Sequence, residues 1–218
     1  DIPIMINDNN SIFSISDFEK QKTTTFRSVK KKWKSYLKKV VYRIIPSISN
    51  NLSSKRNFKE IVSLLKSIEN PKVLIIGGGV ITTGTGILIN TEGIISVESD
   101  VSFGPRTELI LDSHNIPFSD RTFDAVILQA VLEHVIDPFV CISEVERVLK
   151  DSGIVYVATP FMQQVHMGRY DFTRFTYLGH RRLLRKFKEI DAGISAGPGV
   201  ALAWSIKFFL RSLFKNKT

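Results

Sequence analysis

The chain contains almost no cysteine, no long apolar run and fewer acidic than basic residues. Cys141 is the one cysteine among 218 residues, which excludes an internal disulfide framework. No run of about 18 uncharged apolar residues occurs, and the chain does not open on the charged-then-apolar pattern of a secretory signal. No Cys/His spacing typical of zinc is present, so the sequence alone predicts no metal site. These absences favour a protein of the reducing cytoplasm.

Charge is distributed unevenly along the chain. Lys and Arg number 30 against 21 Asp and Glu, and the excess is concentrated before residue 60 and after residue 168. The central part is therefore close to an ordinary soluble domain, long enough to bury a core of its own. We predict an N-terminal extension over residues 1–50, a central domain over 51–195 and a C-terminal amphipathic helix over 196–218.

Amphipathic segments lie in both predicted flanks. Residues 1–26 are polar without a sustained period and are expected at the surface or partly disordered. Residues 27–43 combine an apolar face with eight Lys or Arg residues, which suits packing on the central domain or, as an alternative, an anionic membrane surface. No nucleic-acid partner is expected, because aromatic and basic residues do not interleave as a stacking platform requires. Residues 200–214 are expected to pack on the core, with membrane contact or homodimerisation as alternatives.

Short apolar runs alternate with helical patterns in the central part. This alternation predicts an α/β fold, with a doubly wound, mostly parallel sheet of the Rossmann-like type. The predicted helices cover 54–68 and 137–150, and the predicted strands cover 73–76, 94–97, 108–111, 123–128, 154–158 and 187–192. Ligands are expected at the carboxyl ends of such strands.

A glycine-rich turn follows the first of these central strands. Gly77, Gly78 and Gly79 have no Cβ atoms, so a ligand can approach the backbone and the N–H groups of the next helix. Glu98 ends the following strand 21 residues after Gly77, a spacing that suits a carboxylate accepting hydrogen bonds from ribose hydroxyls. Asp100 is the rival for that role. The pattern predicts a nucleoside-binding βαβ unit.

Residues 112–138 and 144–160 resemble class I S-adenosylmethionine (SAM) dependent methyltransferases, of the small-molecule type that includes the ubiquinone and menaquinone C-methyltransferases. The resemblance rests on three short motifs and on EVERVLKDSGIVYVATP at 144–160; the motifs are Ile116-Pro117-Phe118, Phe123-Asp124 and Leu132-Glu133-His134. It implies a methyltransferase with SAM as its cofactor. A sheet of that family usually has a seventh strand after residue 214, and we expect this strand to be absent or incomplete here.

The resemblance also implies roles for residues near the turn. The three glycines would approach the methionine part of SAM, and Glu98 would hold the ribose. Asp112 and Ser113 would meet the adenine amine, and Gln129 would line the floor of the cofactor site. The glycine loop departs from the family pattern at Ile75 and Ile81. That departure keeps two alternatives open, an inactive methyltransferase-like scaffolding domain and an NAD(P)- or FAD-binding oxidoreductase.

The segment at 160–184, PFMQQVHMGRYDFTRFTYLGHRRLL, is rich in polar and aromatic residues. It resembles a methyltransferase subgroup associated with cell-surface polysaccharide pathways, which implies a small or glycosidic acceptor methylated at oxygen. His166 and Asp171 are the candidates for a catalytic base, and Gln163, Tyr170 and Arg174 are the candidates for binding the acceptor. The alternative is structural, with a loop histidine and an Asp171–Arg174 pair that only holds the loop.

Overall fold

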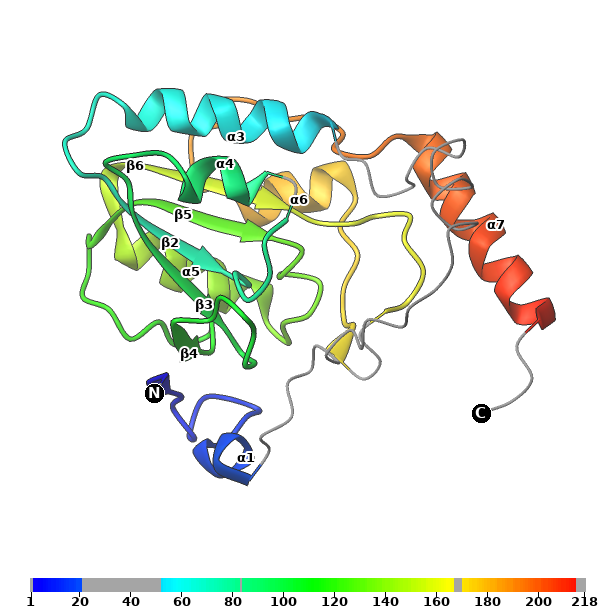
Figure 1. Ribbon diagram of the computed structural model, residues 1–218, viewed down its shortest axis with the longest axis horizontal. Coiled ribbons are helices and arrows are strands. Elements are labelled where there is room, and N and C mark those ends of the chain that lie inside the picture. The colour runs from blue at the N-terminus through cyan, green and yellow to red at the C-terminus, as the bar shows by residue number, and fades with distance from the viewer. Residues whose placement is uncertain (1, 21–51, 83, 167–169, 215–218) are drawn as a thin grey trace, which may run out of the picture.

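The computed structural model describes residues 2–20, 52–82, 84–166 and 170–214, and their fold is built on a six-stranded parallel sheet (Figure 1). The strand order is β1-β4-β3-β2-β5-β6, and each neighbouring pair is parallel. The strands are β1 (Ile4–Met5), β2 (Lys72–Ile76), β3 (Ile95–Asp100), β4 (Leu109–Leu111), β5 (Phe123–Gln129) and β6 (Leu149–Ala158). The predicted Rossmann-like α/β fold is confirmed.

Helices cover both faces of this sheet. The described helices are α1 (Ile15–Lys20), α3 (Leu52–Leu65), α4 (Thr85–Ile89), α5 (Pro138–Val148), α6 (Tyr177–Leu183) and α7 (Pro198–Phe214). In Figure 1, α3 and α4 lie over one face, and α5 and α6 lie over the other. The chain therefore crosses from face to face as it winds, as a parallel sheet requires.

Successive residues of the central strands alternate between the two faces of the sheet. In β2, Val73 and Ile75 belong to the apolar cluster under α3 and α4, whereas Leu74 and Ile76 belong to the cluster under α5 and α6. Successive side chains of a strand point to opposite faces, so a strand covered on both faces is apolar throughout. This burial is why β2 and β5 were readable from the sequence as continuous apolar runs.

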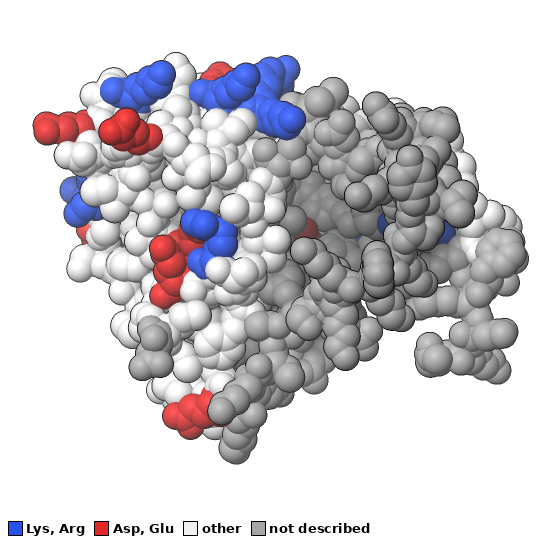
Figure 2. Space-filling view, in the orientation of Figure 1, with Lys and Arg blue, Asp and Glu red and all other residues white. Residues whose placement is uncertain are grey.

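Three predictions about the flanks are wrong. Residues 4–5 form β1 beside β4, and residues 15–20 form α1, where no regular structure was expected. Residues 187–192 do not form a strand. The basic segment at 27–43 lies outside the described residues. On the face drawn in Figure 2, acidic and basic side chains of the described residues lie near one another along the α3 edge.

Helix α7 does not bury the apolar face that was expected to pack on the core. In Figure 1 it extends from the side of the sheet domain. The exposed side chains on it include Leu202, Ile206, Phe209 and Leu210. No described helix is both long and apolar enough to cross a membrane.

We predict that Phe58→Ala lowers the free energy of unfolding by about 3–5 kcal/mol, because a cavity replaces a fully buried ring. Phe58 on α3 has no exposed surface, and its ring packs edge-on against Tyr156 at a centroid distance of 5.2 Å. Leu64→Ala, at an exposed position of the same helix, should cost less than about 1 kcal/mol. Urea titrations of both variants test this, and equal losses would contradict the assigned packing.

Candidate active site

Polar residues gather at the carboxyl edge of the sheet. Gly77 follows β2, Asp100 ends β3, Asp112 follows β4, and Gln129 ends β5. The segment after β6 carries His166 at the same edge. Because all six strands are parallel, these positions lie on one side of the sheet, where α/β proteins bind their ligands.

The glycine turn packs tightly against the end of β3. Gly77 has a φ of +75°, and a Cβ on it would lie 2.6 Å from the Val131 side chain. Gly78 donates its N–H to the Ser99 carbonyl at 2.8 Å. Gly79 donates to Asp100 Oδ2 at 3.2 Å, and a Cβ on it would lie 2.9 Å from that oxygen. The glycines are therefore required by the packing of the turn itself.

Asp100 fixes this turn rather than facing outward. Its side chain is buried and also accepts a hydrogen bond from Ser102 Oγ at 2.9 Å. Burial raises the pKa of Asp100, although these hydrogen bonds oppose the rise. On the other side of the turn, Thr82 Oγ1 donates to Gln129 Oε1 at 3.1 Å and so ties the turn to β5.

Glu98 is buried and paired with an arginine. Its carboxylate is 1% exposed and accepts hydrogen bonds from Arg106 Nε at 2.8 Å to both oxygens. Arg106 Nη2 contacts the same carboxylate. The Arg106 side chain is 36% exposed, so it can move into solvent. A carboxylate offers about four acceptor positions, and ribose hydroxyls would share or replace the arginine.

Asp112 is also paired within the chain. Its carboxylate accepts from His114 Nδ1 at 2.6 Å, from the His114 backbone N–H at 3.0 Å and from Ser11 Oγ. The hydrogen bond to Asp112 raises the pKa of His114 to about 10. Burial opposes ionisation of Asp112, but the His114 and Ser11 hydrogen bonds lower its pKa overall. Ser113 points its hydroxyl to Cys141 Sγ at 3.2 Å.

Residues around His114 also form a surface pocket of about 350 Å³. It is lined by Asn10, Ile12, His114, Ile136, Asp137 and Val140. This volume is at the lower end for small-molecule sites. The N-terminal segment therefore contributes walls to the Asp112 side of the edge, which no residue pattern in that segment predicts.

The residues at this edge fit SAM on its two most specific requirements. A turn without Cβ atoms leads into a helix, and two buried carboxylates lie on adjacent strands, Glu98 within β3 and Asp112 directly after β4. Both carboxylates already have partners in the chain. Cofactor binding is thus an exchange of hydrogen bonds at an existing polar edge.

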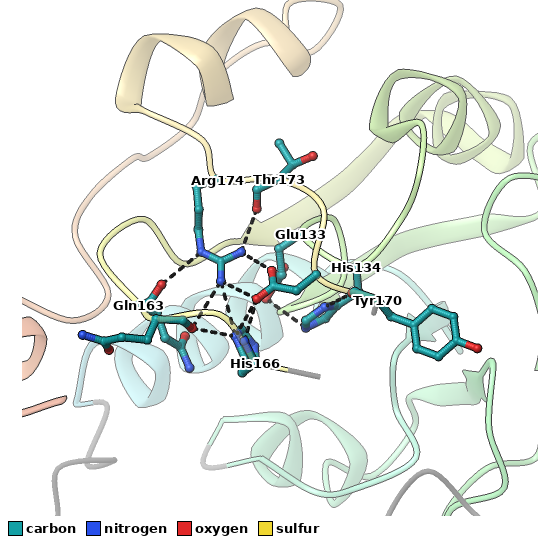
Figure 3. Close-up of polar contacts among 9 residues, drawn as sticks. Glu133, His134, Gln163, His166, Tyr170, Thr173 and Arg174 are labelled. Carbon is teal, nitrogen blue, oxygen red and sulfur yellow. Dashed lines mark hydrogen bonds and ion pairs between the residues drawn. The ribbon is translucent and has the colours of Figure 1, made fainter. Parts of the chain in front are cut away.

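A second polar cluster lies beyond β5. The chain turns at Ala130, whose φ of +57° costs a non-glycine residue about 1–2 kcal/mol. Glu133 follows with no exposed surface, and its backbone carbonyl accepts from Phe172 N at 2.8 Å. His134 Nδ1 lies 2.6 Å from the Tyr170 carbonyl oxygen. The His134 ring packs edge-on against the His166 ring, with a centroid distance of 4.7 Å (Figure 3).

Burial controls the ionisation of this cluster. It raises the pKa of Glu133 to about 7, and it lowers the pKa of His134. Neither carboxylate oxygen of Glu133 has a hydrogen-bond partner among the described residues. The sequence analysis used Glu133 only as part of a family motif, and no spacing rule connects it with His166.

Asp171 and Arg174 hold the segment after β6. The Asp171 side chain is 1% exposed. Its carboxylate accepts hydrogen bonds from Arg174 Nη2 at 2.7 Å, from Arg174 Nη1 and from the His166 backbone N–H at 2.6 Å. These hydrogen bonds keep the pKa of Asp171 well below its ordinary value. Arg174 also donates to the carbonyls of Gln163 and Thr173 (Figure 3). The guanidinium is therefore largely used within the loop.

We predict that the stability contributed by the His114–Asp112 pair is lost at alkaline pH. The folded pKa of His114 is about 10 and its ordinary value is 6.5, so the contribution is full below pH 6.5 and disappears as the pH rises towards 10. The difference in unfolding free energy between the unchanged chain and His114→Gln should shrink over that range. For His180→Gln, the difference in unfolding free energy should instead become smaller as the pH falls below 6.5, because burial lowers the pKa of His180. Parallel slopes for the two variants would contradict the pairing.

Three comparisons with known proteins bear on this edge. Residues 86–157 match the family model described as a methyltransferase domain. Protein MJ0638 of Methanocaldococcus jannaschii is 29% identical over 175 residues, which cover 76% of this chain and 72% of that protein.

Solved structures share part of the fold. A chain of the complex between a Haloferax volcanii methyltransferase activator and a putative methyltransferase covers 62% of this chain and 70% of its own length, with 20% identity and a TM-score of 0.44. The match to a putative methyltransferase of Bacillus halodurans covers 59% of this chain and 64% of that chain, with 17% identity and a TM-score of 0.45. These partial superpositions carry no argument about substrates or partners.

The methyltransferase-domain match covers the motif region between α4 and the end of β6. It agrees with the resemblance carried by residues 112–138 and 144–160, and it leaves the oxidoreductase alternative without support. The match supports a SAM-dependent methyltransferase activity, with SAM as the cofactor.

Proposed function

We propose that the chain transfers the methyl group of SAM to a hydroxyl oxygen of a small or sugar-linked acceptor. The observation that carries this proposal is the cluster of His134, His166 and Asp171 at the same sheet edge as the glycine turn. An oxygen acceptor has a proton to lose, and an imidazole is the side chain best suited to take it near neutral pH.

The cofactor residues in this proposal are those at the ends of the first central strands. They are Gly77, Gly78, Gly79, Glu98, Asp112, Ser113 and Gln129. Bound SAM supplies a methyl group on a positively charged sulfur, which an oxygen lone pair can attack. Glu98 holds the ribose once Arg106 shares or releases the carboxylate, and the Ser113 backbone and Asp112 meet the adenine.

His166 is the proposed base, and Asp171 orients it. The His166 ring nitrogen Nδ1 lies 3.5 Å from Asp171 Oδ2, an arrangement in which a carboxylate fixes the orientation of the base. The acceptor oxygen bonds to the methyl carbon as the bond from that carbon to sulfur breaks, and the hydroxyl proton passes to the imidazole. The low pKa of Asp171 makes it unsuitable as the proton acceptor itself.

The proposed acceptor contacts differ in how much of each side chain is available. Arg174 spends hydrogen bonds on Asp171 and on two loop carbonyls, so it positions the loop under the acceptor. The Tyr170 ring packs against Phe13 at 5.6 Å and forms one wall of the proposed acceptor site. Gln163 lies on the same loop, where its backbone carbonyl accepts from Arg174.

A second function follows from a specific observation. Both carboxylates assigned to the cofactor are paired within the chain, Glu98 with Arg106 and Asp112 with His114. A domain that had lost catalysis and kept only a scaffolding role would need no release of these pairs. Measured turnover of SAM with any acceptor removes this alternative.

We predict that Glu98→Gln weakens binding of S-adenosylhomocysteine (SAH) more than tenfold. A charged acceptor is replaced by a neutral one, and hydrogen bonds to charged groups contribute about 1.5–3 kcal/mol. Isothermal titration calorimetry with SAH measures the effect. Glu92→Gln, at an exposed acid before β3, is the matched control and should bind as the unchanged chain does. Equal affinities for all three proteins would refute the ribose assignment.

We predict that His166→Gln lowers kcat by about 10²–10⁴-fold, the usual contribution of a general base. SAH release is measured with a panel of glycosides, sugar nucleotides and phenols. SAH affinity should stay within about twofold, since the base acts on the acceptor. His180 is a half-buried histidine on α6, and His180→Gln should keep the kcat and the SAH affinity of the unchanged chain. Unchanged kcat in folded His166→Gln would remove His166 from the mechanism.

A further inference from the structure

The carboxylate of Glu133 has no hydrogen-bond partner among the described residues although it is completely buried. Its exposed fraction is 0%, and neither oxygen accepts a hydrogen bond from any described residue. An isolated buried carboxylate is unfavourable, because desolvation is not repaid by a hydrogen bond or an opposite charge. Such an orphaned group in a native fold indicates that something is bound there under working conditions.

His134 presents a ring nitrogen to this carboxylate. His134 Nε2 lies 3.7 Å from Glu133 Oε1. The other nitrogen, Nδ1, lies 2.6 Å from the Tyr170 carbonyl oxygen, which can only accept, so Nδ1 carries the proton. This tautomer leaves a lone pair on Nε2. A metal-binding histidine is oriented in the same way by a hydrogen bond at its second nitrogen.

His166 completes the group from the segment after β6. One ligand atom each from Glu133, His134 and His166 can be chosen so that all three lie within 4.8 Å of one another. The Gln164 carbonyl at 3.3 Å and Asp171 Oδ2 at 3.5 Å are acceptors near His166 Nδ1, and the donor Arg174 Nη2 lies 3.4 Å from the same nitrogen. Together these contacts orient the His166 ring.

We propose that Glu133, His134 and His166 bind one divalent transition-metal ion, with zinc as the best match. Two imidazoles and a carboxylate are the donors that such ions prefer, whereas magnesium and calcium prefer oxygen alone. Ligand atoms at about 2.1 Å from a tetrahedral ion lie roughly 3.4 Å apart. The three ligand atoms now lie within 4.8 Å of one another, so they need to close by at most about 1.4 Å. The two histidines are partly exposed at 19% and 26%, which gives the ion a route inward.

The ion would have a position left for a substrate atom. Three protein ligands with one open position are typical of catalytic rather than structural zinc. This role rests on the proposed function: the open position faces the acceptor side, where a hydroxyl oxygen would bind. A ring nitrogen of His166 that binds the ion cannot also accept a proton, so the ion-free and ion-bound chains use His166 differently.

The test uses the full chain, stripped with a chelator and dialysed, without SAM or acceptor. Calorimetric titration with zinc chloride is expected to show one ion per chain. Cobalt(II) at the same site should give visible absorption bands that excess magnesium does not remove. Glu133→Gln, which keeps the side-chain volume, and His134→Ala and His166→Ala should each weaken zinc binding at least tenfold. His180→Ala should bind as the unchanged chain does.

Two results would overturn the inference. One is no zinc or cobalt binding by the folded unchanged chain. The other is equal zinc affinity in the unchanged chain and in Glu133→Gln, whose fold is checked by circular dichroism. SAH binding, measured in chelator, is scored separately, so failure of the metal site and failure of the cofactor assignment give different results.

Discussion

The ion pair between the buried Asp171 carboxylate and Arg174 determines where the proposed acceptor side of the site lies. The Asp171 carboxylate also accepts the backbone N–H of His166, and Arg174 reaches the carbonyl of Gln163. Removing one partner would leave a buried charge without compensation, which typically costs about 3–5 kcal/mol. This ion pair therefore holds the described residues between β6 and α6 together with the Phe172 N–H bond to the Glu133 carbonyl, and the position of His166 against His134 depends on it.

On the proposed cofactor side, buried carboxylates are also paired within the chain, and a ligand has to replace or share these partners. Glu98 is matched by Arg106, and Asp112 is matched by His114 and by Ser11 from the N-terminal segment. These contacts satisfy the buried carboxylates before any ligand binds. Affinity for SAM is then the difference between new hydrogen bonds and those given up, which makes the partly exposed Arg106 as important as the carboxylate it contacts.

The sequence predicted the sheet well because burial on both faces leaves a strong pattern. Val73 to Ile76 form a continuous apolar run that only a covered strand explains. The two-residue strand at Ile4 and Met5 is too short for any period to appear, and it exists through pairing with β4. The candidate site was only partly predictable, since His166 lies 32 residues after His134 in the chain, and the fold alone brings them together.

The unpaired carboxylate of Glu133 links the fold to the chemistry on both sides of it. A leucine at this position would be buried at no electrostatic cost, so a buried acid is a departure from what stability alone favours. Arg174 lowers the pKa of Glu133 and Asp171 raises it, and these influences leave burial as the dominant effect. The Arg174 charge is already neutralised by Asp171. What the carboxylate lacks is a cation of its own, and the two imidazoles beside it can help to bind one.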